Sequence, residues 1–257
     1  MGAASLFFAG FHVLGGERPE WRTLIFLMSS TLITYNMHWL LAGRAFHRSR
    51  QEEKHQWYAQ HYLFGWCVFG LALVGELWGV LGLGWREWLF FAHLGAIAVL
   101  YNLPEHRTPG WLVSIRSIPF LKIFLIAYLW TALGAGYPAL LLNVLTWQSV
   151  GWFWGLFAYI LAITLPFDVR DLLEDKKKGV RTLPSILGLK GTKGLAYALL
   201  LVFMAGGIES GYGILPTVLL ILGAGMGIGF TNAGRHELFF TGFLDGLLVL
   251  FGLLIAI

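Results

Sequence analysis

The chain has 257 residues, of which 57% are hydrophobic and only 12% are charged, against roughly 25% charged residues in a soluble domain. This composition excludes an ordinary water-soluble globular protein. The formal net charge of +4 comes with no basic stripe of interleaved aromatic residues, so nothing in the sequence indicates nucleic-acid binding. The single cysteine, Cys67, lies in an apolar stretch, which excludes a disulfide framework and a metal cluster of thiolates.

Apolar stretches near the length that crosses a bilayer, roughly 20 residues, recur along the whole chain. They are apolar on every side, which is typical of membrane helices and not of alternating barrel strands. We predict an all-α polytopic membrane protein, with nine transmembrane helices in a single domain of residues 1–257. The predicted helices cover residues 1–15, 22–43, 61–83, 86–103, 118–144, 150–168, 194–209, 212–232 and 238–257. A cleaved signal peptide is the alternative for the short first helix, although its start "MGAASLFF" carries no basic residue.

Lys and Arg are distributed unevenly between the two sets of loops. Of the 18 Lys and Arg residues, all but Arg18, Arg22 and Arg86 follow the second, fourth, sixth or eighth predicted helix. Positively charged residues concentrate in cytoplasmic loops. We therefore predict that the N-terminus and these loops are cytoplasmic and that the C-terminus is outside. The compact chain looks bacterial and is expected in the inner membrane.

The stretch "LPFDVRDLLEDKKKGVRTLP", residues 165–184, concentrates charge in this apolar chain. It holds nine of the 32 Asp, Glu, Lys and Arg residues. On a helix, residues three and seven positions apart return to nearly the same face. Asp168, Asp171 and Asp175 have that spacing and should project together, whereas Arg170 and Glu174 should point elsewhere.

Three carboxylates on one face repel one another and are expensive to bury near lipid, so a cation is expected among them. Mg²⁺ is the natural candidate, because it binds one or two carboxylates and shares its other positions with water and phosphates. Lys178 and Arg181, just beyond, are placed to contact phosphate. The alternative is a solvated cap at the membrane surface, in which the lysines only determine topology.

This stretch resembles the second aspartate-rich motif of the UbiA superfamily of intramembrane prenyltransferases, whose pattern is close to DxRDxxxDxxxGxxTLPxxLG. The matching residues are Asp168, Arg170, Asp171, Asp175, Gly179, Thr182, Leu183, Pro184 and Gly188. "YNLPEHR" and "IPFLKIFLIAYLW" resemble the family's region between the fourth and fifth helices, and "GFLDGLL" resembles its last helix. The resemblance covers nearly the whole chain.

The resemblance implies a single UbiA-like bundle and a Mg²⁺-dependent enzyme. Members of this superfamily ionise a prenyl diphosphate and transfer the prenyl group to an aromatic or other lipophilic acceptor. Carried over by position, the expected catalytic and Mg²⁺-binding residues are Asp168, Asp171 and Asp175. The expected diphosphate-binding residues are Asn36, Arg44, Arg107, Lys122, Arg170, Lys178 and Arg181, with Tyr101 and Asp245 as further pocket residues. The implied partners are the prenyl diphosphate, the acceptor and the lipid bilayer.

The chain departs from the family at its first motif, NDxxDxxxD. The matching segment, "TYNMHWLLAGRAFHR", keeps Asn36 but places Met37, Leu40 and Arg44 at the aspartate positions. Arg44 could replace a metal as the counter-charge of the phosphates, since arginine is always charged and forks onto phosphate oxygens. A non-catalytic UbiA-like protein that binds an isoprenoid or assists a partner enzyme is the alternative function. Asp245 either pairs with a buried donor or lines the pocket.

Overall fold

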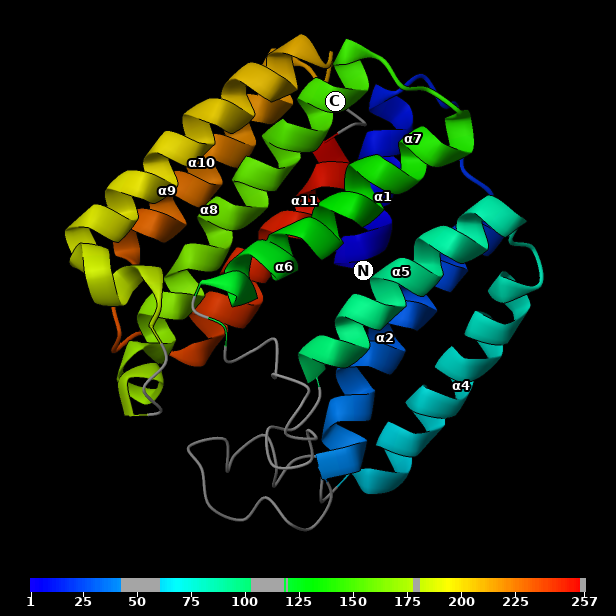
Figure 1. Cartoon of the computed structure of the whole chain (residues 1–257), viewed down its shortest axis with the longest axis horizontal. Coiled ribbons are helices and arrows are strands. Elements are labelled where there is room, and N and C mark those ends of the chain that lie inside the picture. The colour runs from blue at the N-terminus through cyan, green and yellow to red at the C-terminus, as the bar shows by residue number, and fades with distance from the viewer. Residues whose placement is uncertain (43–60, 103–117, 119, 178–180, 255–257) are drawn as a thin grey trace. The chain divides into compact units, whose positions relative to one another are not determined.

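The structure, a computed structural model, describes residues 1–42, 61–102, 118, 120–177 and 181–254. These residues form helices joined by turns, with no strand among them, which confirms the predicted all-α class (Figure 1). They group into two compact units, one of Met1–Arg18 with Phe90–Ile257 and one of Pro19–Leu89. The single-domain organisation stays a prediction.

The unit Pro19–Leu89 is built on two packed helices, α2 (Trp21–Ala42) and α4 (Tyr62–Val80). Gly75 lies on the packed face of α4, where a Cβ atom would collide with the hydroxyl of Ser29 on α2. Small residues at such contacts let membrane helices approach closely. One residue further along, Glu76 accepts a hydrogen bond from Ser30 Oγ at 2.7 Å.

The other unit carries the C-terminal half of the fold. It begins with α1 (Gly2–Val13) and includes most of α5 (Trp85–Asn102). The remaining elements are α6 (Leu121–Thr131), η4 (Ala132–Gly136), α7 (Tyr137–Leu142), α8 (Trp147–Lys177), α9 (Leu183–Glu209), α10 (Ile214–Phe230), η5 (Phe239–Leu244) and α11 (Asp245–Leu254). The short elements η4 and η5 are π-helical turns that continue directly into α7 and α11.

Helix α8 forms the centre of this unit and packs against α6 and α9. Its apolar side chains, among them Trp152, Leu156 and Tyr159, are fully buried. The indole of Trp152 donates a hydrogen bond to the backbone oxygen of Gly134 in η4, at 3.1 Å. A Cβ atom at Gly10 of α1 would collide with that same oxygen. Helices α1 and α8 are thus fixed against the same turn of η4.

Four helices in the described part of the chain are long and apolar enough to cross a membrane: Leu63–Val80, Leu121–Leu142, Trp147–Leu173 and Leu183–Glu209. Shorter apolar helices cover Gly2–Val13, Ile214–Phe230 and Phe239–Leu254. The protein is an integral membrane protein. A helix lies at each of the nine predicted positions, but the number of crossings stays a prediction.

Two helix boundaries differ from the sequence prediction, and both concern the charged stretch. Helix α8 runs on to Lys177, nine residues beyond the predicted end, so Asp168, Asp171 and Asp175 are all helical. Helix α9 begins at Leu183, where Thr182 and Ser185 exchange hydrogen bonds as a cap. Gly188 then breaks the helix, with φ 64°. The predicted end of α8 was too early because it was set where the apolar sequence stops, whereas the helical backbone continues through the charged residues that follow.

Candidate active site at the end of α8

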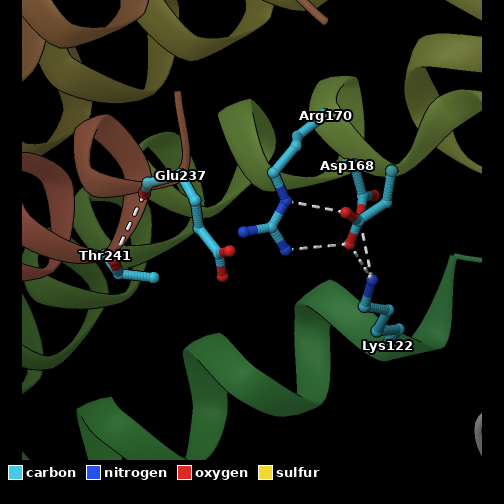
Figure 2. A network of polar contacts seen from close by, with 6 residues as sticks. Lys122, Asp168, Arg170, Glu237 and Thr241 are labelled. Atoms are coloured by element: carbon cyan, nitrogen blue, oxygen red, sulfur yellow. Dashed lines mark hydrogen bonds and ion pairs between the residues drawn. The ribbon is translucent and has the colours of Figure 1, made fainter. Parts of the chain in front are cut away.

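The charged end of α8 meets the start of α6 and the region that leads into α11. Asp168 and Asp171 project from one face of α8, as their three-residue spacing predicts. Lys122, the second residue of α6, reaches both of them from the neighbouring helix (Figure 2). The sequence places these residues almost fifty positions apart, so only the packing of α6 on α8 brings them together.

Lys122 forms an ion pair with each carboxylate at the same distance. Its Nζ lies 3.5 Å from Asp168 Oδ1 and 3.5 Å from Asp171 Oδ2. The side chain of Asp168 is only 3% exposed, and those of Asp171 and Lys122 are 24% and 21% exposed. Asp168 Oδ1 is fully buried, and its contact with Lys122 is an ion pair and not a short hydrogen bond. Two carboxylate oxygens from different residues therefore converge on one point of positive charge.

Arg170 holds Asp171 from the other side. Its Nε and Nη2 donate to the two carboxylate oxygens of Asp171, at 2.8 and 3.3 Å. The guanidinium also lies 5.3 Å from the ring centres of Phe167 and Phe240. Such forked, charge-assisted pairs are among the stronger hydrogen bonds in proteins.

The prediction that Arg170 points away from the carboxylates is therefore wrong. Helical spacing does place its Cα off that face, but its long side chain folds back to the adjacent Asp171, and its charge lies beside the rings of Phe167 and Phe240. The side chain of Glu174 lies outside the described part of the structure.

The region around η5 adds two carboxylates that spacing did not connect to the motif. Glu237, just before η5, faces the guanidinium of Arg170 from the side opposite Asp168 (Figure 2). Glu237 and Asp245, the first residue of α11, both act electrostatically on Arg170. Asp245 is exposed and belongs to the surroundings of this cation. Sequence reasoning missed Glu237, because it lies outside every matched motif and reaches the site only through tertiary packing.

The third aspartate of the motif, Asp175, acts electrostatically on Asp168. Among the described residues, no three His, Cys, Asp or Glu side chains are arranged so that they alone could hold a metal ion. The three-aspartate metal site thus stays a prediction.

The pair of Asp168 and Asp171 nevertheless fits one Mg²⁺. Both present hard carboxylate oxygens, and Lys122 Nζ marks a position between them where positive charge is already bound. Mg²⁺ commonly takes one or two carboxylates and completes its coordination with water and substrate phosphates. This donor set suits a metal ion that binds together with a diphosphate.

Other predicted site residues are placed less fully. Arg44, Arg107 and Lys178 lie outside the described residues. Asn36, with Met37 and Leu40, is on α2 and Tyr101 is on α5, but their side chains lie outside the described part. Arg181 is exposed just before α9. Their roles at a diphosphate stay predictions.

No model of a known protein family and no curated protein matches the sequence. The fold is similar to the apo structure of a UbiA homolog from Aeropyrum pernix K1, with a TM-score of 0.60 and 16% sequence identity. The similarity covers 99% of this chain and 96% of that chain. At this identity the similarity shows the fold, and it supports the resemblance first noted in the charged stretch.

Proposed function

We propose that this chain of UbiA-type fold transfers a prenyl group from a prenyl diphosphate to an aromatic or other lipophilic acceptor in the membrane. Mg²⁺-assisted loss of pyrophosphate would drive the transfer. One observation carries the proposal: the carboxylates of Asp168 and Asp171 both contact Lys122 at the end of α8, which has the largest buried share of the four long apolar helices described. A pair of carboxylates with one member buried and the other partly buried is costly near lipid and suggests a function.

Asp168 and Asp171 would hold Mg²⁺, which when bound would stabilise the negative charge that develops on the leaving pyrophosphate. Arg170 would keep Asp171 in position through its forked hydrogen bonds. Lys122 lies beside both carboxylates, and we propose that it contacts the phosphates. From the family resemblance alone, we propose that Asn36, Arg44, Arg107, Lys178 and Arg181 add phosphate contacts and that Tyr101 is a further pocket residue.

The contacts around Lys122 also support the proposed orientation in the membrane. One cluster brings together the start of α6, the end of α8 and Glu237 before η5. Each of them borders or lies in a loop that the charge bias assigns to the cytoplasm. We propose nine crossings, with the N-terminus and this cluster on the cytoplasmic side of a bacterial inner membrane. The diphosphate would enter from the cytoplasm while its apolar tail lies among the helices.

A second candidate is a non-catalytic UbiA-like protein that binds an isoprenoid. It is favoured by the charge balance of the site, since Lys122 and Arg170 already compensate Asp168 and Asp171. Met37 and Leu40 in the first motif also supply no further carboxylate. Such a protein would bind a prenyl diphosphate but release no pyrophosphate.

Binding of geranylgeranyl diphosphate to the purified full chain, with and without Mg²⁺, tests the site. We expect Mg²⁺-dependent binding that Asp171→Asn abolishes. Glu209→Gln is the matched control. It also removes one negative charge, but Glu209 is the last residue of α9, at the end of that helix away from the charged stretch, so binding should be unchanged. Equal affinity in wild type and Asp171→Asn would mean that the carboxylates only form a solvated cap.

A further inference from the structure

The two cations of the cluster are held in different ways. Arg170 makes a forked pair with Asp171, with its shorter bond at 2.8 Å, and lies against the rings of Phe167 and Phe240. The contacts of Lys122 with the two carboxylates are both 3.5 Å long. Arg170 therefore has the geometry of a fixed counter-charge.

Lys122 is suited to be an exchangeable counter-charge. It comes from a different helix, and its ammonium is a compact point charge on a flexible four-carbon stem. Its side chain is 21% exposed, so the ammonium is partly accessible to solvent and to a ligand. Its ammonium lies 3.5 Å from one oxygen of each aspartate, so it would compete with a divalent cation for the same two carboxylates.

We propose, on the basis of the proposed function, that Lys122 occupies the cation position between Asp168 and Asp171 until a diphosphate brings Mg²⁺. With Mg²⁺ and diphosphate bound, the ammonium of Lys122 would leave the two carboxylates and pair with a phosphate oxygen. Mg²⁺ alone binds poorly, because it would have to share two carboxylates with a positive charge already paired to them. The phosphates supply the negative charge that lets both cations stay, so metal and diphosphate each raise the affinity of the other.

The exchange can be measured without turnover and without a prenyl substrate. Mn²⁺ replaces Mg²⁺ as the probe, and the electron paramagnetic resonance signal of free Mn²⁺ is titrated with the full chain in detergent micelles. In Lys122→Met, which keeps an apolar stem and removes the charge, we expect the affinity for Mn²⁺ alone to rise by about tenfold or more. In Lys122→Arg, which keeps the charge, the affinity should remain near that of wild type.

Two further variants locate the effect. Lys193→Met removes a lysine whose Nζ donates to the backbone oxygen of Gly229, outside the cluster, and should leave Mn²⁺ binding unchanged. Adding Asp171→Asn to Lys122→Met should abolish the gain. Circular dichroism establishes that each variant is folded before it is titrated.

An unchanged Mn²⁺ affinity in folded Lys122→Met overturns the exchange, and so does a gain that survives Asp171→Asn. Because no prenyl diphosphate is present, the tighter binding is expected even if the chain uses a different diphosphate. If the wild-type chain instead shows no Mg²⁺-dependent binding of a prenyl diphosphate, while Mn²⁺ binds more tightly to Lys122→Met, only the proposed function is contradicted.

Discussion

Replacing Arg170 by methionine tests how the charged end of α8 is held together. The change removes both hydrogen bonds to Asp171 and the contacts with the rings of Phe167 and Phe240. It also leaves Glu237 without the guanidinium that it faces. We expect a less stable protein, because Asp171 would keep its negative charge in a partly buried position with one counter-charge fewer.

The magnitude follows from how far the pair is buried. Removing one partner of a fully buried ion pair costs about 3–5 kcal/mol, whereas exposed pairs contribute about 0–1 kcal/mol. The side chains of Arg170 and Asp171 are 29% and 24% exposed, which lies between these limits. We therefore expect a loss of about 2 kcal/mol. In a chain of this size that lowers the unfolding temperature by about 4–8 °C.

Thermal unfolding in detergent micelles, followed by circular dichroism, gives the measurement. Arg170→Lys keeps the charge but loses the fork, so its unfolding temperature should lie between those of wild type and Arg170→Met. The double variant Arg170→Met/Asp171→Asn should recover part of the loss, because the uncompensated carboxylate is gone. If Arg170→Met unfolds at the wild-type temperature, the guanidinium does not anchor this cluster.

Two predictions concern helix packing, one in each of the two units. Gly10→Ala should destabilise the protein by about 1–3 kcal/mol, because its Cβ would collide with the backbone oxygen of Gly134. Gly194→Ala, with open space around its Cβ, should be neutral or stabilising. If Gly10→Ala unfolds at a higher temperature than Gly194→Ala, the packing of α1 against η4 is contradicted. Ser30→Ala should cost about 1–2 kcal/mol, because Glu76 loses the hydrogen bond that it accepts at 2.7 Å. Thermal unfolding of Ser30→Ala, with Ser30→Val as a second variant, measures this cost. If neither variant is less stable than wild type, the hydrogen bond contributes little to stability.

Spacing along one helix was the most informative part of the sequence. It predicted that Asp168 and Asp171 share a face, because the period of a helix is fixed whatever surrounds it. It could not predict which cations face them. Lys122 was expected at the diphosphate from the family resemblance, but its contact with both aspartates depends on how α6 packs against α8.

Arg170 shows the limit of the same reasoning. Helical spacing gives the direction of a Cα–Cβ bond, and a long flexible side chain can return to the neighbouring face. Glu237 shows a second limit, since no motif includes it and only the tertiary fold brings it to Arg170. Apolar length located the helices well, whereas the charged end of α8 gives no hydropathy signal. At the start of α9, Pro184 and Gly188 interrupt an apolar sequence that is already helical.

Release of pyrophosphate tests the central claim most directly. The purified chain would be given geranyl, farnesyl and geranylgeranyl diphosphates together with lipid extracts as a source of acceptor, with and without Mg²⁺. Asp171→Asn and the Glu209→Gln control would be assayed beside it. We predict Mg²⁺-dependent release with at least one of these substrates in wild type and in Glu209→Gln, and none in Asp171→Asn. Mg²⁺-dependent binding without release under these conditions would contradict the proposed transfer and indicate a protein of UbiA-type fold that only binds its isoprenoid.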